Sequence, residues 1–318
     1  MRARLSAGGY ALAWRLSQLL PERLVLAIAR LFADRAFRRN GRAVQRLRGN
    51  LARVVGPGAT AEQLDRLTRA GLRSYSRYWV EMFRLPVLPA ERIVREMQVE
   101  NEDLLRSAYA AGNGVILALP HSGNWDHAGA WAVSTGMPFT TVAERLQPES
   151  LFDRFVRFRR NLGMEVLPIG GREDVTTSTL GARLRAGGMV CLLADRDLTG
   201  RGVEVQFFGE PARMPAGPAA LALSTGAVLL PVVLWFAQPT GWRARILPPV
   251  PVPPPGERGA RIAEMTQHLV DALATGIAEH PEDWHMLQRA WISQAARSPR
   301  SAGVPFAAAA SPGDEGAT

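Results

Sequence analysis

Five consecutive apolar residues, Val115 to Leu119, lie between a glycine and a proline. The run is too short for a helix, and a short apolar run between turn residues is typical of a buried strand in an α/β sheet. The segment that follows, H-S-G-N-W-D, begins at His121 and ends at Asp126. Its glycine ends the strand, and Asn124 can cap a new helix. We therefore expect His121 on a loop at the carboxyl end of a strand, where open α/β sheets place their ligands.

His121 and Asp126 are a candidate catalytic pair. On one continuous helix their side chains would point roughly 140° away from each other, whereas a strand–turn–helix allows them to converge. A carboxylate beside an imidazole fixes the tautomer of the ring and makes the ring a better base. A lone histidine at the end of a strand is more often structural, so the argument for catalysis depends on a carboxylate partner.

A second carboxylate, Asp195, follows the apolar run Met189 to Ala194 and is expected at the same edge of the sheet as His121. Either Asp126 or Asp195 could hold the imidazole, and Asp197 is a weaker candidate. Asp195 could also cap a helix or pair with a neighbouring arginine, because structural ion pairs use the same residue types. Cys191 lies inside the apolar run, which favours a core residue over a nucleophile. No Gly-x-Ser-x-Gly motif is present, so we expect direct attack on a thioester without a serine intermediate.

Strand-like and helix-like segments alternate along the chain, which predicts a mostly parallel central sheet flanked by helices on both faces. We expect strands at 97–100, 115–119, 138–143, 164–168, 189–194, 227–236 and 242–247. We expect helices at 102–110, 149–162, 172–186, 216–225 and 257–279. Thr60-x-x-Gln63 is a capping-box pattern that predicts the start of a further helix running to about Phe83, and the stripe at its end is expected to pack in the core: Tyr75, Tyr78, Trp79, Met82 and Phe83. Residues 195–215 are expected to form a long polar loop, and E-D-W-H-M-L-Q-R, from Glu282, to begin a further helix.

The first 54 residues are strongly basic, with twelve arginines against Glu22 and Asp34, a balance of +10. Since the whole chain carries +9, the remaining residues sum to about −1. Apolar residues from Leu19 to Phe32 interleave with the arginines. Helices that lie on an anionic membrane surface have this composition. The alternative is a set of core-facing helices in a protein whose 38 basic residues are all arginine. No nucleic-acid-binding signature is present, so we expect no nucleic-acid partner.

The chain is long enough for a sizeable core, and we expect one domain over residues 1–294, with amphipathic membrane-facing helices in 1–54. Alanine, serine, proline and glycine dominate residues 295–318, as in disordered tails. The apolar stretch from Ala7 to Leu20 is shorter than the ~20 residues a membrane span requires, and no clear signal-peptide cleavage site follows it. A single cysteine allows no disulfide within the chain, which suits the cytoplasm. We expect a peripheral protein at the cytoplasmic face of the plasma membrane.

Two blocks of the sequence resemble a known family. H-S-G-N-W-D matches the His-x4-Asp motif of glycerolipid and glycolipid acyltransferases, in the form used by the lipid A late-acyltransferase branch. Ala194 to Ala222, A-D-R-D-L-T-G-R-G-V-E-V-Q-F-F-G-E-P-A-R-M-P-A-G-P-A-A-L-A, resembles the same branch. Because the first motif is short enough to occur by chance, the second block makes the resemblance specific. The likeness extends over roughly Tyr10 to Trp291 and is greatest to the phosphatidylinositol mannoside acyltransferases.

The resemblance implies an enzyme that moves a fatty acyl chain, palmitoyl, from acyl-CoA as co-substrate to a mannose hydroxyl of a phosphatidylinositol mannoside. It implies no other cofactor, and it gives Asp195 the place of the acidic partner of the catalytic histidine. Arginine forks suit the phosphates of coenzyme A. The positions that match binding sites for acyl-CoA or its product are Arg159, Arg201 and Ser224. Glu144 and Arg145, which follow the predicted strand 138–143, are expected at the same edge and could bind sugar hydroxyls.

Several other functions remain open from the sequence. The chain could be another glycolipid or lipid A-type acyltransferase, or a thioesterase that uses the same pair with water as acceptor. It could also be a membrane-binding module without catalysis. Two clusters, His121 with Asp126 and His127, and His280 with His285, lack the spacing of established metal sites, so we expect no metal.

Overall fold

The computed structural model describes residues 14–144, 149–169, 173–197, 200–237 and 240–295. A seven-stranded sheet forms the centre of the molecule, in the order β1-β9-β8-β2-β5-β3-β4. All neighbouring pairs are parallel except β8 and β9, which are antiparallel, so the predicted mostly parallel α/β sheet is confirmed. The strands are β1 Met97–Glu100, β2 Val115–Leu119, β3 Phe139–Glu144, β4 Glu165–Ile169, β5 Met189–Leu193, β8 Val228–Phe236 and β9 Trp242–Ile246.

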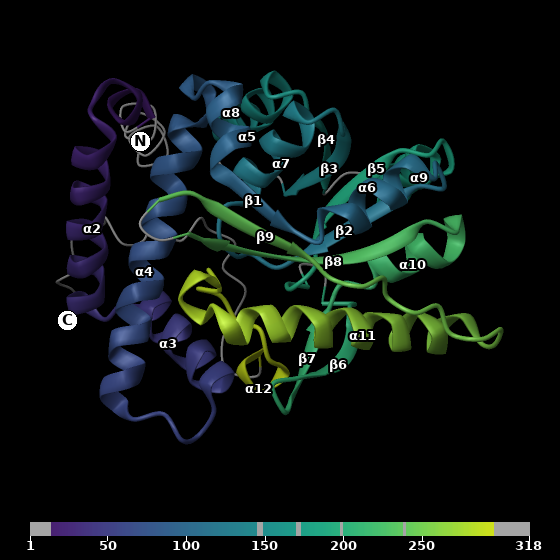
Figure 1. Cartoon of the computed structure of the whole chain (residues 1–318). Coiled ribbons are helices and arrows are strands. Elements are labelled where there is room, and N and C mark those ends of the chain that lie inside the picture. Colours follow the sequence, from purple (N-terminus) through teal and green to yellow (C-terminus); the bar gives the residue numbers. More distant parts are fainter. Residues whose placement is uncertain (1–13, 145–148, 170–172, 198–199, 238–239, 296–318) are drawn as a thin grey trace.

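Helices cover both faces of this sheet (Figure 1). One face packs against α5 Ala90–Glu96, α6 Glu102–Ala110, α7 Trp125–Ser134 and α8 Glu149–Asn161. The other packs against α9 Glu173–Arg185, α10 Gly217–Thr225 and α11 Arg258–Glu279. In β2, Val115 and Leu117 belong to the first core and Ile116 and Ala118 to the second. The continuous apolar run of β2 is therefore explained, because the strand is buried on both sides.

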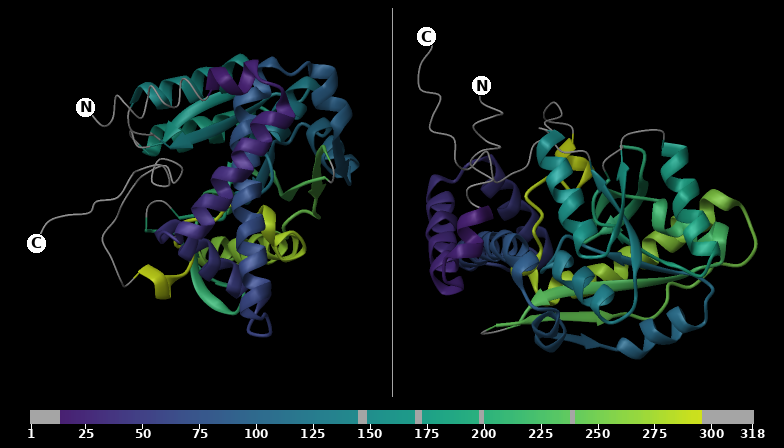
Figure 2. Two further views of the ribbon diagram at one scale, coloured as in Figure 1. Left: turned by 90° about the vertical axis from the view of Figure 1, so that its left-hand side faces the viewer. Right: turned by 90° about the horizontal axis from the view of Figure 1, so that it is seen from above.

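Three helices stand at one end of the molecule (Figure 2): α2 Glu22–Arg39, α3 Arg42–Val55 and α4 Ala61–Arg84. The sequence motif that predicted the start of α4 is confirmed, since Thr60 and Gln63 form a reciprocal capping box. Asp34 of α2 accepts paired hydrogen bonds from Arg69 and Arg73 of α4, which hold the pKa of that carboxyl well below its usual range. This fork fixes which side of α2 faces the protein.

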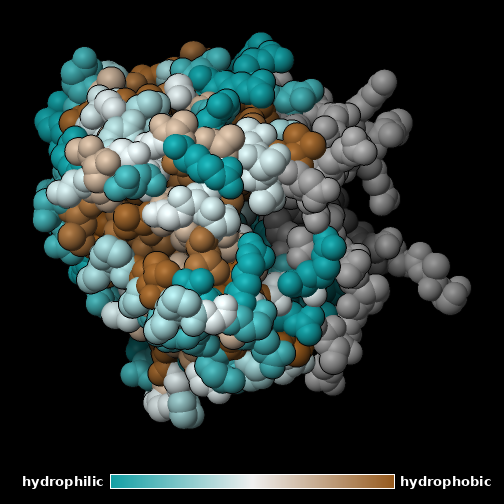
Figure 3. Space-filling model, turned by 90° about the vertical axis from the view of Figure 1, so that its right-hand side faces the viewer, coloured by the Kyte–Doolittle hydropathy of each residue, from teal (hydrophilic) through white to brown (hydrophobic). Residues whose placement is uncertain are grey.

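The opposite side of α2 exposes large apolar side chains. Of the most exposed ones, Leu31 is 68 % and Phe32 61 % accessible, and Leu24 and Ile28 lie on the same helix face. Leu16 and Leu19, in the helical residues 14–19, are also exposed. On the face of the molecule turned away from these helices, hydrophobic and hydrophilic residues are interspersed (Figure 3). No helix in the described ranges is both long and apolar enough to cross a membrane.

Two predictions for the second half of the chain are wrong. The expected loop 195–215 contains a hairpin of β6 Val203–Phe207 and β7 Glu210–Met214. Its first strand alternates exposed Glu204 and Gln206 with buried Val205 and Phe207, which is the pattern of a half-buried strand. Phe208 and Gly209 both have positive φ angles, as a two-residue hairpin turn requires.

The helix expected from Glu282 does not form. A 3-10 turn η2, Pro281–Asp283, is followed by extended chain, and the short helix α12 spans only Ile292–Ala295. The main-chain N–H of His285 donates to the carbonyl of His121 and not to a carbonyl within its own segment. A long-range partner thus replaces the helical hydrogen bond. The predicted tail, 295–318, lies outside the described residues apart from Ala295, and the single-domain assignment stays a prediction.

Candidate active site

His121 and Asp195 meet at the carboxyl edge of the sheet. They follow the neighbouring parallel strands β2 and β5, in which Leu119 and Leu193 are paired, so the two side chains lie at the same level. The Nδ1 atom of His121 is 2.6 Å from Asp195 Oδ1, and the His121 main-chain N–H donates to Asp195 Oδ2 at 2.8 Å. The geometry therefore places Asp195, and not Asp126, against the imidazole.

Asp195 is 2 % exposed. Burial opposes its ionisation, but the charge of His121 and the hydrogen bonds from His121 and from Trp284 Nε1 outweigh burial and keep the pKa of this carboxyl below its ordinary value. With an ionised Asp195 on Nδ1, the tautomer of His121 that carries its proton on Nδ1 is stabilised. Nε2 is then the basic atom of the ring.

The loop after β2 is held by the segment around Trp284. Gly123 N–H donates to the carbonyl of Asp283, and Ser122 forms an isolated bridge with Trp284. Gly123 has a φ of +53°, and a Cβ atom there would lie 2.9 Å from the main chain of Leu234. Only glycine accommodates both the left-handed conformation and the close approach of β8.

Asp126 has other partners than the imidazole. It lies in the first turn of α7 and is 2 % exposed. Arg159 of α8 donates to it through Nε at 2.6 Å and Nη2 at 3.2 Å, and the hydroxyl of Tyr78 of α4 donates to it at 2.9 Å. The convergence of His121 and Asp126 considered from the sequence is not seen. Asp126 instead ties together three helices around the site.

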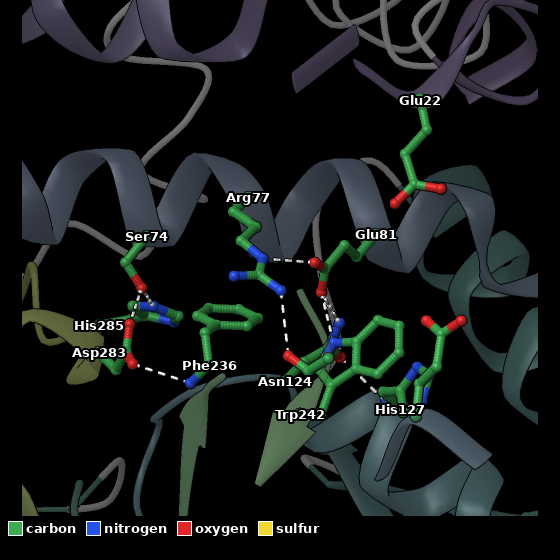
Figure 4. A network of polar contacts seen from close by, with 12 residues as sticks. Glu22, Ser74, Arg77, Glu81, Asn124, His127, Phe236, Trp242, Asp283 and His285 are labelled. Atoms are coloured by element: carbon green, nitrogen blue, oxygen red, sulfur yellow. Dashed lines mark hydrogen bonds and ion pairs between the residues drawn. The ribbon is translucent and has the colours of Figure 1, made fainter. Parts of the chain in front are cut away.

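The start of α7 is anchored by a further buried network (Figure 4). Asn124 caps the helix by accepting from His127 N–H, and its own amide donates to Glu81 Oε2 at 3.0 Å. The same oxygen accepts from Trp242 Nε1 at 2.7 Å, while Glu81 Oε1 pairs with Arg77. Helix α4 thereby fixes the loop that carries His121.

An apolar cavity of about 180 Å³ opens beside His121 and runs between α7 and the sheet. Its polar lining consists mainly of His121, Asp126, Arg159 and Arg196. The rest is mainly hydrophobic, from the sheet and from the small residues of α7: Leu117, Leu119, Val232, Leu234, Ala244, Ile246, Ala128, Gly129 and Ala132. A mostly apolar lining with a few polar groups at one end is typical of a site for a small apolar ligand.

The remaining predicted site residues are placed differently. Arg201 is exposed on the segment between Asp195 and β6. Glu144 ends β3, one strand from β5 in the sheet, and Arg145 lies outside the described residues. Ser224 lies near the end of α10, and β8 then begins beside Val115, at the amino end of β2. The structure therefore does not bring Ser224 to the edge that carries His121.

Sequence reasoning missed Tyr78, Glu81 and Trp284. The first two are in α4, where the aromatic stripe predicted core packing, and Tyr78 does have a 4 % exposed ring in the core. Trp284 was assigned to a helix that does not form. Nothing in their local patterns indicates partners that lie between 43 and 161 residues away, since such partners depend on the tertiary fold.

The histidines considered for metal binding have aromatic or carboxylate neighbours. His127 stacks on Trp242, with ring centroids 3.5 Å apart, and His280 stacks on Trp235 at 4.5 Å. Within the described ranges, no three His, Cys, Asp or Glu side chains gather in a group that could hold a metal ion. Burial raises the pKa of the Cys191 thiol, which makes it a poor nucleophile.

The protein is an α/β protein with a buried aspartate against an imidazole at the carboxyl edge of a mostly parallel sheet. An imidazole held in this way can act as a general base, and the apolar cavity beside it suits an apolar ligand. The chain belongs to the family described as bacterial lipid A biosynthesis acyltransferase, whose family model matches residues 7–293. It is therefore an acyltransferase by homology, and the resemblance drawn from the two sequence blocks is confirmed.

Two relatives are similar over almost their whole length. One is the phosphatidylinositol mannoside acyltransferase of Mycolicibacterium smegmatis, 49 % identical over 285 residues, which cover 90 % of this chain and 91 % of the relative. The other is the phosphatidylinositol mannoside acyltransferase of Mycobacterium tuberculosis, 47 % identical over 296 residues, which cover 92 % of this chain and 90 % of the relative.

Proposed function

We propose that this protein transfers a fatty acyl chain, palmitoyl, from acyl-CoA to a mannose hydroxyl of a phosphatidylinositol mannoside. The acceptor follows from the names of the two similar enzymes. The observation that carries the proposal is the His121–Asp195 pair beside an apolar cavity. Acyl transfer to an alcohol needs a base, because a hydroxyl is a poor nucleophile at neutral pH.

In the proposed mechanism His121 is the general base. Its Nδ1–H donates to Asp195, so Nε2 takes the proton of the acceptor hydroxyl as the hydroxyl oxygen attacks the thioester carbonyl. The carbonyl carbon forms a bond to that oxygen, its bond to sulfur breaks, and the imidazolium returns the proton to the departing coenzyme A thiolate. Asp195 stays ionised and stabilises the imidazolium. No covalent acyl-enzyme forms.

We propose that the acyl chain lies in the cavity between α7 and the sheet, where burial of methylene groups contributes ~0.8 kcal/mol each. The thioester then lies at His121, and the coenzyme extends to the outside. Arg201 is a proposed ligand of its phosphates. Arg159 lines the same cavity, but its buried ion pair with Asp126 supports a role in holding the site together. Glu144 and Arg145 are proposed to bind the sugar.

We also propose that the protein is peripheral to the cytoplasmic face of the plasma membrane, where both the acceptor lipid and acyl-CoA can reach it. The exposed apolar face of α2 and the basic balance of the amino-terminal helices support contact with an anionic lipid surface.

The test is an incubation of the full-length protein with labelled palmitoyl-CoA, with and without phosphatidylinositol mannoside in vesicles. We expect label in the glycolipid only when the acceptor is present, and a kcat about 10²–10⁴-fold lower for His121→Ala. Release of free fatty acid at the same rate without acceptor would show a thioesterase. Label in lipid A-type acceptors but not in the mannoside would change the acceptor. Near wild-type transfer by His121→Ala would refute the proposed mechanism.

A further inference from the structure

We propose that Trp284 is a positioning residue that aims the Asp195 carboxylate at His121. This inference rests on the proposed role of His121 as the base. Trp284 has no exposed surface, and its Nε1–H donates to Asp195 Oδ2 at 2.8 Å. It touches Asp195 and not the imidazole, so its effect on catalysis passes through the carboxylate.

The two oxygens of Asp195 have separate partners. Oδ2 accepts from the main-chain N–H of His121 and from the indole of Trp284, each at 2.8 Å, and this leaves Oδ1 for Nδ1 of His121 at 2.6 Å. An indole N–H can only donate, so it accepts no proton from Asp195 and always favours the ionised carboxylate. Without that donor, the carboxylate would be held by His121 alone, through its main-chain N–H and its Nδ1.

The position of the indole is set by the main chain and by ring packing. His285 N–H donates to the carbonyl of His121 at 2.8 Å, and the bridge between Ser122 and Trp284 joins the same two segments. Phe207 and Trp291 meet the indole in edge-to-face arrangements, with ring centroids at 5.8 and 6.1 Å. The β6–β7 hairpin is thus linked to Asp195 by the packing of Phe207 against the Trp284 ring.

The segment that carries Trp284 is also anchored from the side of α4 (Figure 4). The Asp283 carboxylate accepts from the Ser74 hydroxyl at 2.5 Å and from Phe236 N–H at 2.9 Å. Ser74 also contacts Nε2 of His285 at 2.8 Å. Because the residues on both sides of Trp284 are held, the direction of its N–H is fixed before substrate binds.

A purely structural role for Trp284 can be separated from positioning because the chain offers a matched control. Trp291 is 2 % exposed, packs in the same aromatic cluster and donates its Nε1–H to a carbonyl, that of Phe207, at 2.9 Å. Trp284→Phe and Trp291→Phe each remove one buried indole donor and leave a ring. They differ in the acceptor that loses its donor: the Asp195 carboxylate, which is the partner of His121, in Trp284→Phe, and the Phe207 carbonyl in Trp291→Phe.

We expect Trp284→Phe to lower kcat for acyl transfer roughly ten- to a hundredfold, with KM for acyl-CoA within about twofold, because a misaligned catalytic group impairs the chemical step and not binding. Trp291→Phe keeps an aromatic ring against Trp284 and leaves the indole donor to Asp195 in place, so it should keep wild-type kcat at a similar loss of melting temperature. If Trp284→Phe does not fold, Phe207→Leu leaves the donor but loosens the ring, and it should give a smaller drop in kcat at unchanged KM.

A second readout does not depend on turnover. In protein labelled with ¹⁵N-histidine, the His121 ring signals, assigned by their loss in His121→Gln, should report the tautomer with its proton on Nδ1. We expect Trp284→Phe to alter these signals and Trp291→Phe to leave them unchanged. Equal spectra and equal kcat for the two variants would overturn the inference. If wild-type protein transfers no acyl group while the spectra differ as expected, the proposed function fails and the positioning role stands.

Discussion

At the scale of single residues, two carboxylates near His121 have separate partners. Asp195 contacts the imidazole, whereas Asp126 is held by Arg159 and Tyr78. Asp195→Asn keeps the shape of the side chain but favours the wrong tautomer of His121. We expect kcat to fall roughly 10³–10⁴-fold with KM for acyl-CoA little changed, as measured by steady-state kinetics.

Asp126→Asn is the matched comparison. It leaves the Arg159 guanidinium buried without its carboxylate, and removal of one partner of a buried ion pair costs about 3–5 kcal/mol of folding stability. Denaturant unfolding should show this loss, whereas Asp195→Asn should lose less. The assignment is wrong if Asp195→Asn stays active while Asp126→Asn is inactive at unchanged stability, because Asp126 would then be the partner of the imidazole.

At the scale of elements, the cavity depends on small residues along α7. Ala132 lies seven residues after Trp125, about 10 Å further along the helix, and both line the cavity. Ala132→Leu should fill the part remote from His121. We expect the ratio of kcat/KM for palmitoyl-CoA to that for octanoyl-CoA to fall about tenfold or more, since a long chain loses methylene contacts that a short one does not make.

Ala130→Leu is the control for this substitution, because Ala130 is equally buried on α7 but does not line the cavity. Both variants overfill the core at a cost of about 1–3 kcal/mol. An equal change in chain-length preference for the two variants, or none for Ala132→Leu, would place the acyl chain elsewhere.

At the scale of the whole molecule, exposed apolar residues gather on α2, beside exposed arginines. We expect sedimentation with anionic vesicles that weakens as salt rises, because screening shortens the reach of surface charges. Phe32→Glu should weaken binding roughly tenfold, because it removes an exposed aromatic ring that would enter the lipid surface and adds charge repulsion. Val252→Glu, at the same 61 % exposure elsewhere, should bind as wild type. Binding that is equal for neutral and anionic vesicles at every salt concentration would remove the electrostatic part of this prediction.

Much of the fold could be predicted because it depends on short-range patterns. The apolar run of β2, the Thr60–Gln63 capping box and the alternation of strands and helices each follow from neighbours within a few residues. The β6–β7 hairpin was also encoded locally, in the alternation of Val203–Phe207, but the polar residues of the segment predicted a loop. The helix expected from Glu282 failed for another reason, because a long-range hydrogen bond to His121 took the place of a local one.

By itself, the sequence determined that His121 follows a buried strand, that Asp195 follows another, and that the amino end is basic and apolar. It left open which carboxylate holds the imidazole. Only the tertiary structure decided this, because β2 and β5 are neighbours in register, whereas the first turn of α7 directs Asp126 toward Arg159 and Tyr78. The contact of Trp284 with Asp195 joins residues 89 positions apart. The direction of a buried hydrogen bond depends on the packing of all the elements around it, and no local pattern in the sequence records that packing.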